Sequence, residues 1–136
     1  MGTWGTNTFQ TDTALDWFGE LGDVDDPLAF LEDSLTPHIA GGRLDASSAE
    51  HVICAAEVVA AVLGQPSESL HPEVLAWASA HEDLEVAELV PQAVHALRHV
   101  LADDSELNEI WLETDAHDEW RRPVAALRRR LRRSAD

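Results

Sequence analysis

The sequence predicts an all-α protein: a compact, irregular bundle of about six or seven helices with no significant sheet. Three observations support this. Apolar residues recur at helical spacing along most of the chain, Gly and Pro separate these segments, and no alternation of polar and apolar residues marks a strand of any length. With 136 residues, 45% of them hydrophobic, we expect a single domain over residues 1–136 with one core.

The first expected helix follows Thr11, Asp12 or Thr13, each of which can cap it, and Thr13 and Asp16 have the spacing of a capping box. We expect it to end at Gly22. Its apolar residues share one face and are Ala14, Leu15, Trp17, Phe18 and Leu21.

The second expected helix is short. Asp26 can cap it, Pro27 can occupy its first turn, and it should stop before Pro37. The side chains that we expect it to bury are Leu28, Leu31 and Leu35.

The third expected helix, at residues 48–63, should be the central one. Ser47 and Glu50 have the spacing of a capping box, and Gly64 follows as a stop. The segment is apolar on most sides, which is typical of a helix surrounded by others.

Three further helices follow. The fourth opens at His71 and Pro72 and ends near His81, and the fifth tolerates Pro91 in its first turn. The sixth covers residues 105–114 behind a cap that is either Asp103 or Asp104. The residues that it should bury are Leu107, Ile110 and Trp111.

The last expected helix, at residues 118–133, is a basic covering helix. A narrow apolar seam runs along it, made of Trp120, Val124, Leu127 and Leu131. Seven arginines make up its basic surface: Arg121, Arg122, Arg128, Arg129, Arg130, Arg132 and Arg133.

Charge is distributed unevenly along the chain. The formal net charge is −17, and only two Arg precede residue 121. Such an acidic body repels nucleic acid and anionic lipid, so we do not expect a nucleic-acid partner and favour a cationic partner or simple solubility. The basic helix should be attracted to its own acidic body, or to that of another subunit.

We expect a cytoplasmic location. No apolar run approaches the roughly 18 residues that span a bilayer, and residues 1–12 lack the pattern of a secretory signal. Cys54 is the only cysteine, so it cannot form an internal disulfide and should be a small buried hydrophobe.

Several short motifs resemble one family. They are the opening Met1-Gly2-Thr3-Trp4-Gly5 with Phe9, Asp12 and Trp17, the Ala55–Ala60 block with Gly64, Ser105-Glu106-Leu107 with Ile110-Trp111, and Trp120, Val124 and Leu127. In this order they resemble a bacterial family known as domain of unknown function 4259. The resemblance implies a helical cytoplasmic protein and brings no activity to transfer. The chain departs from the family's pattern at Thr13, where an acidic residue is common.

The N-terminal segment, residues 1–11, should dock into the core through Trp4 and Phe9, which are large apolar side chains. The two alternatives to this docking are that the segment forms a backbone cradle for an anion, or that it forms an edge that binds a partner. It is not a P-loop, because no Gly-Lys-Ser or Gly-Lys-Thr follows.

A candidate polar site centres on Glu57, a carboxylate in the middle of the apolar third helix. An unpaired charge there would be costly, so we expect it to accept hydrogen bonds from the N-terminal segment or from a buried Trp indole. The alternative is a functional site that Glu57 forms with Asp12, Asp16 and Trp4, because carboxylates from different helices can converge inside a bundle.

His95 and His99 are weak candidates for a metal site. Their i, i+4 spacing suits two zinc ligands, but seven His in 136 residues make one such pair unsurprising. We expect ordinary surface residues, no bound metal and no cofactor.

The leading functional hypothesis is therefore a non-enzymatic module that binds a protein partner or self-associates. A metal-assisted hydrolase that uses Glu57, Asp12 and Asp16 is the alternative from a different class. A third hypothesis is a module that binds an anionic surface through the arginine helix.

Overall fold

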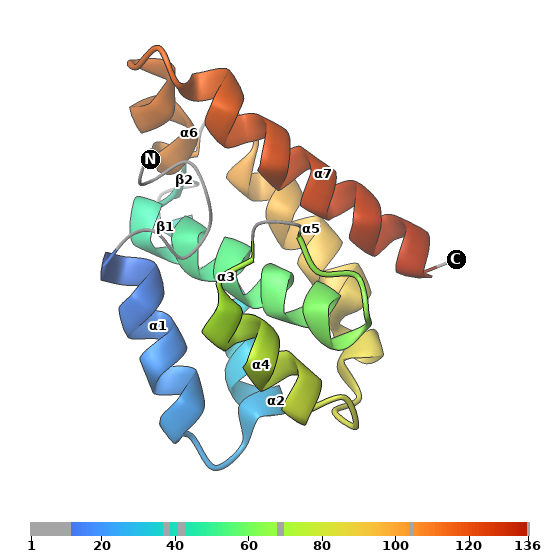
Figure 1. The fold of residues 1–136 in the computed structure, drawn as a ribbon. Coiled ribbons are helices and arrows are strands. Elements are labelled where there is room, and N and C mark those ends of the chain that lie inside the picture. The colour runs from blue at the N-terminus through green and yellow to red at the C-terminus, as the bar shows by residue number, and fades with distance from the viewer. Residues whose placement is uncertain (1–11, 37–38, 41–42, 68–69, 104, 136) are drawn as a thin grey trace.

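The computed structural model describes residues 12–36, 39–40, 43–67, 70–103 and 105–135. This part of the chain forms seven α-helices and one 3₁₀ helix, Val86–Leu89 (Figure 1). The α-helices are α1 (Asp12–Asp23), α2 (Pro27–Ser34), α3 (Ala46–Val62), α4 (Pro72–Ala80), α5 (Val90–Val100), α6 (Glu106–Leu112) and α7 (His117–Ala135). Two strands of two residues each, β1 (Ile39–Ala40) and β2 (Arg43–Leu44), pair antiparallel. The predicted all-α class is confirmed, and this short ladder is its only β structure among the described residues.

Helix α3 lies at the centre of the bundle. It packs against each of the six other α-helices, and every side chain from Val52 to Val62 is buried (Figure 1). It begins at Ala46 after Asp45, so the predicted cap at Ser47 is wrong by two positions. The central position of the helix is confirmed, and so is its apolar character.

Gly64 ends α3, as predicted. Its φ of 85° lies in the left-handed region that a residue without Cβ adopts at no steric cost. Its N–H donates to Ala61 O at 3.0 Å, and the N–H of Gln65 donates to Ala60 O at 2.8 Å. This pair of bonds is a Schellman motif, which satisfies carbonyls that the end of the helix would leave without partners.

Helix α1 begins at Asp12, within the predicted range, and differs from its prediction in two details. It continues through Gly22 to Asp23, and Thr13 lies inside the first turn, so the predicted capping box does not form. Leu15 is 43% exposed and does not join the buried face of Ala14, Trp17 and Leu21. The apolar stripe of α1 is therefore narrower than the sequence suggested.

Helices α2 and α4 begin as predicted. Asp26 caps α2, its Oδ1 accepting from the N–H of Ala29 at 3.1 Å, and Leu31 and Leu35 are buried while Leu28 is partly buried. The ring Nδ1 of His71 accepts from the N–H of Glu73 at 3.1 Å and caps α4. In both helices Pro occupies the first turn, where its missing N–H costs no helical hydrogen bond.

Helix α6 corrects two predictions. Its cap is Ser105, whose Oγ accepts from the N–H of Asn108 at 3.4 Å, and not Asp103 or Asp104. Ile110 is 47% exposed, and the buried residues of α6 are Leu107 and Asn108. Asn108 can be buried because its Oδ1 accepts from Nε2 of His117 at 2.8 Å.

Helix α7 lies across α5, α3 and α6 (Figure 1). Its predicted apolar seam of Trp120, Val124, Leu127 and Leu131 is fully buried, and the helix continues through Pro123. In the part of the chain that the structure describes, no helix is both long and apolar enough to cross a membrane.

Candidate functional site

Glu57 is buried, 6% exposed, and forms an ion pair with an arginine of α7. Nη2 of Arg130 donates to its Oε1 at 3.3 Å, while Nη1 of the same guanidinium donates to Gln65 O at 3.0 Å. The sequence showed that Glu57 needs a partner but missed Arg130. A signal was available, because Arg130 follows Leu127 of the seam by three residues and therefore borders the buried face of α7.

The described carboxylates of the candidate polar site, Asp12 and Asp16, form no metal-binding group with Glu57. Asp12 and Asp16 are exposed on α1. Among the described residues, no group of three or more His, Cys, Asp or Glu side chains is arranged to hold a metal ion. Trp4 and the rest of the segment 1–11 lie outside the described residues.

Three arginines of α7 are turned toward the body of the protein. Besides Arg130, Nη1 of Arg121 donates to Leu101 O at 3.1 Å and Nε of Arg128 donates to Val94 O at 3.3 Å. Leu101 is the C-cap of α5 and Gln65 follows α3, so two of these guanidinium groups contact the negative ends of helix dipoles. These three arginines thus contact the body mainly through backbone carbonyls, and the ion pair with Glu57 is the one that joins them to another described residue.

The remaining arginines of α7 point outward. Arg122, Arg129, Arg132 and Arg133 are exposed, and no hydrogen bond or ion pair joins them to any described residue. At about 100° per residue, Arg122, Arg129 and Arg133 lie within about 40° of one another on the helix. They form a stripe directly opposite the buried seam.

His95 and His99 contact each other on α5. Their Nε2 atoms are 3.3 Å apart, and the rings meet edge to face with centroids 4.8 Å apart. His95 is exposed, and no third metal-binding side chain among the described residues completes a cluster with the pair.

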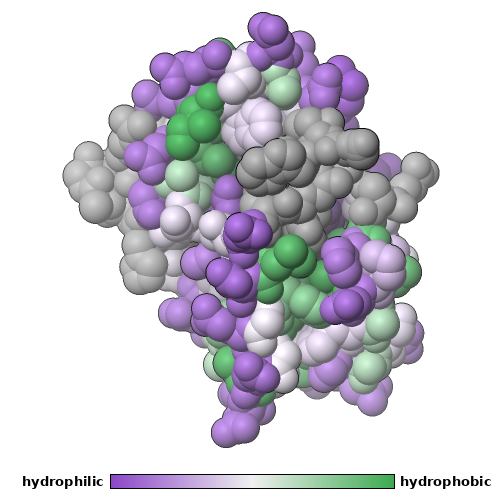
Figure 2. All heavy atoms as spheres, turned by 60° about the vertical axis from the view of Figure 1, so that its left-hand side comes forward, coloured by the Kyte–Doolittle hydropathy of each residue, from purple (hydrophilic) through white to green (hydrophobic). Residues whose placement is uncertain are grey.

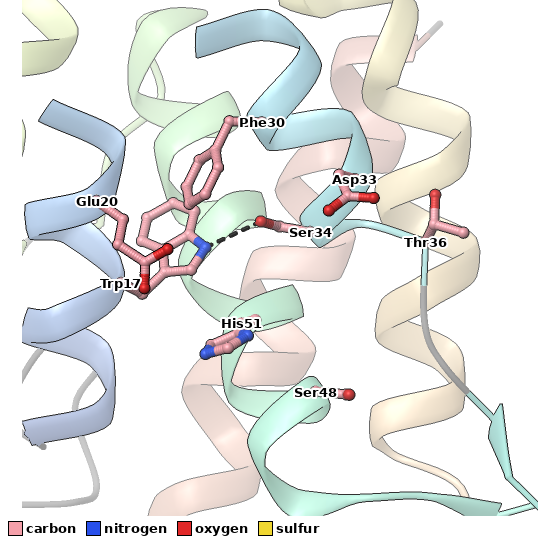
Figure 3. Close-up of a pocket in the computed structure, with 8 residues that line it drawn as sticks. All are labelled: Trp17, Glu20, Phe30, Asp33, Ser34, Thr36, Ser48 and His51. Carbon is pink, nitrogen blue, oxygen red and sulfur yellow. Dashed lines mark hydrogen bonds between the residues drawn. The ribbon is translucent and has the colours of Figure 1, made fainter. Parts of the chain in front are cut away.

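A pocket of about 220 Å³ opens between α1, α2 and the first turns of α3 (Figure 3). Nε1 of Trp17 donates to Oγ of Ser34 at 2.9 Å, and the ring of Phe30 lies tilted against the indole at 5.5 Å. Figure 3 shows Glu20 and Asp33 on opposite sides of this hydrogen bond. The sequence did not predict this pocket, because it depends on how three separate segments pack.

A shallower depression of about 370 Å³ lies on α6 and has an acidic border. Ile110 is 47% exposed and Leu112 is 56% exposed, and Glu106, Glu109 and Glu113 surround them. Figure 2 shows that the side of the molecule turned forward there is mostly hydrophilic, with hydrophobic side chains gathered in small separate areas. An apolar centre with an acidic border is the arrangement that a cationic amphipathic segment complements.

Two titratable groups of α3 have displaced pKa values: Asp45 at its N-cap and Cys54 in its middle. A hydrogen bond from the Ser48 side chain lowers the pKa of the Asp45 carboxyl at the start of the helix, despite the opposing effect of partial burial. Complete burial raises the pKa of the Cys54 thiol well above its usual range, and the nearby charges of Glu50 and Glu57 act in the same direction. Cys54 is therefore a poor nucleophile in the folded protein, as the sequence suggested.

Comparison with known proteins identifies a family. The family described as Domain of unknown function (DUF4259) matches residues 2–123. Neither a curated protein nor a solved structure matches the chain.

Proposed function

The chain belongs to the DUF4259 family, and we propose that it is a non-enzymatic protein-interaction module that binds a cationic, amphipathic segment of its partner. One observation carries this proposal: the depression on α6, where Ile110 and Leu112 are exposed among three glutamates. Exposed large apolar side chains with a polar border are typical of the contact surfaces of proteins.

The chemistry of this surface selects the partner. Ile110 and Leu112 offer exposed apolar area. Its removal from water on binding is favourable by about 25 cal/mol per Å². Glu113 is exposed, so its charge is available to a guanidinium or ammonium group of the partner. A net charge of −17 would also speed the approach of a cationic partner.

A designed peptide tests the proposal. The probe is a fluorescent helix of about 18 residues with Leu along one face and Arg along the other, and a peptide of the same composition in scrambled order is the control. We expect fluorescence anisotropy to show saturable binding of the amphipathic peptide, and binding about tenfold weaker for Ile110→Ser and for Glu113→Lys.

A matched variant separates the site from the general attraction of an acidic protein. Glu85→Lys makes the same change of charge at an exposed carboxylate that does not line the depression, and it should bind the peptide almost as the unchanged protein does. Equal weakening by Glu85→Lys and Glu113→Lys, or equal binding of the scrambled peptide, would refute the proposal.

We also propose that the module works in the cytoplasm. The support is the single Cys54, a buried thiol of the kind that persists in a reducing compartment. Fractionation of cells that produce the protein would contradict this if the protein were recovered outside the cytosolic fraction.

A further inference from the structure

The outward faces of α6 and α7 carry the same spacing of charges with opposite signs. On α6 and its C-cap, Glu106 and Glu113 flank Ile110 at positions −4 and +3. On α7, Arg122 and Arg129 flank Ala126 at positions −4 and +3. Because residues three and four apart lie on one side of a helix, each face has a charged, apolar, charged order along its length.

Both faces carry exposed side chains. On α7, Ala126 lies on the side of the helix opposite the buried seam. On α6, Ile110 lies at the border of the buried face, three residues after buried Leu107. Ile110 is 47% exposed, and Arg122 and Arg129 make no hydrogen bond or ion pair with any described residue. Within the described part of the chain, no ion pair joins Glu106 or Glu113 to Arg122 or Arg129.

We infer that the cationic segment bound by the α6 depression is the outer face of α7 of a second copy of this chain, which rests on the function proposed above. Ile110 would pack against Ala126, and the small alanine leaves room between the arginines for the larger side chain. Glu113 would then meet Arg129, and Glu106 would meet Arg122. Oε1 of Glu106 would still accept the N–H of Ala46, at 2.7 Å.

The net charge does not prevent this pairing. At physiological ionic strength the Debye length is about 8 Å, so the repulsion between two acidic bodies is screened beyond that distance. Pairs in direct contact are screened much less. The contact therefore depends on local complementarity, and reversing a single charge within it should have a large effect.

Sedimentation analysis over about a hundredfold range of protein concentration tests the inference by mass action. We expect reversible self-association of the full chain. Arg129→Glu and Glu113→Arg should each weaken the association at least about tenfold, because each places like charges in contact. The chain with both substitutions should regain it, because the pair is then restored with its signs exchanged.

Arg132→Glu is the matched control. Arg132 is an exposed arginine of the same helix, about 80° away from the outer stripe, so this variant should associate like the unchanged chain. Unchanged thermal unfolding of each variant at low concentration shows that the fold is intact.

The outcomes separate this inference from the proposed function. A chain that remains monomeric throughout, or a double variant that fails to regain association, overturns the self-association. If the monomeric chain still binds the amphipathic peptide at α6, the proposed function stands and only the identity of the partner is wrong. If neither association nor peptide binding occurs, both fall.

Discussion

The arginines on the two sides of α7 have the same chemistry and different environments. Arg121, Arg128 and Arg130 face the body and donate to backbone carbonyls, and Arg130 also pairs with Glu57. Arg122 and Arg129 are exposed and make no hydrogen bond or ion pair with the described part of the chain. Position around the helix thus decides which arginines attach α7 to the body and which remain exposed to solvent.

Removing Arg130 should have the largest effect on stability. Arg130→Ala removes the guanidinium that pairs with the buried carboxylate of Glu57, which should lower the free energy of unfolding by about 3 kcal/mol. Urea unfolding at neutral pH measures the change. A matched double variant, Arg130→Met with Glu57→Leu, should lie within about 1 kcal/mol of the unchanged protein, because it removes both charges together. A single variant that loses less than the double variant would contradict this account.

Removing Arg121 should have a smaller effect. Arg121→Met keeps most of the apolar stem but removes the hydrogen bond to Leu101 O at the end of α5, which should cost about 1–2 kcal/mol in the same unfolding experiment. The helix end then loses a cation that stabilises its dipole. If Arg121→Met proves as stable as Arg122→Met, the difference between the inward and outward arginines is unimportant for stability.

Asp45 extends the comparison to the opposite, positive end of a helix. Its folded pKa is lowered by the hydrogen bond from Ser48, so its stabilising contribution is complete above the ordinary pKa of an Asp and is lost as pH falls through the lowered value. Asp45→Asn should therefore be less stable than the unchanged protein at neutral pH, and the difference should shrink in acid. An NMR titration should also show a higher pKa for Asp45 in Ser48→Ala. A stability difference that grows on acidification would contradict the sign.

Arg129→Gln should have the smallest effect on the fold. Because Arg129 is exposed and joined to no described residue, the free energy of unfolding should change by less than about 0.5 kcal/mol. The same change should weaken self-association. A clear loss of stability in dilute solution would show that the outer arginines also support the monomer.

The sequence predicted the fold best where a local signal decides the outcome. Gly64 ends α3 through its positive φ, and Asp26 and Pro27 start α2 through one side chain and one missing N–H. The prediction of the α6 cap failed, because Asp103 and Asp104 are as good caps as Ser105 and only the path of the chain selects among the three.

The candidate site was less predictable, since it depends on contacts between distant segments. Ile110 fits a buried stripe by its spacing, yet the orientation of α6 buries Asn108, which finds a partner in His117. The need of Glu57 for a partner was predictable from its apolar surroundings, but Arg130 lies 73 residues away in sequence. The pocket at Trp17 likewise requires three helices to meet.

Because Cys54 is buried, its alkylation can report how often the whole protein opens. The only thiol of the chain lies on α3, which every other α-helix covers, so an alkylating reagent should reach it only when the bundle opens as a whole. Where reclosing is faster than alkylation, the labelling rate divided by that of a small free thiol gives the population of the open state. The only thiol thus lets the population of the open state be measured without denaturant and without an introduced cysteine.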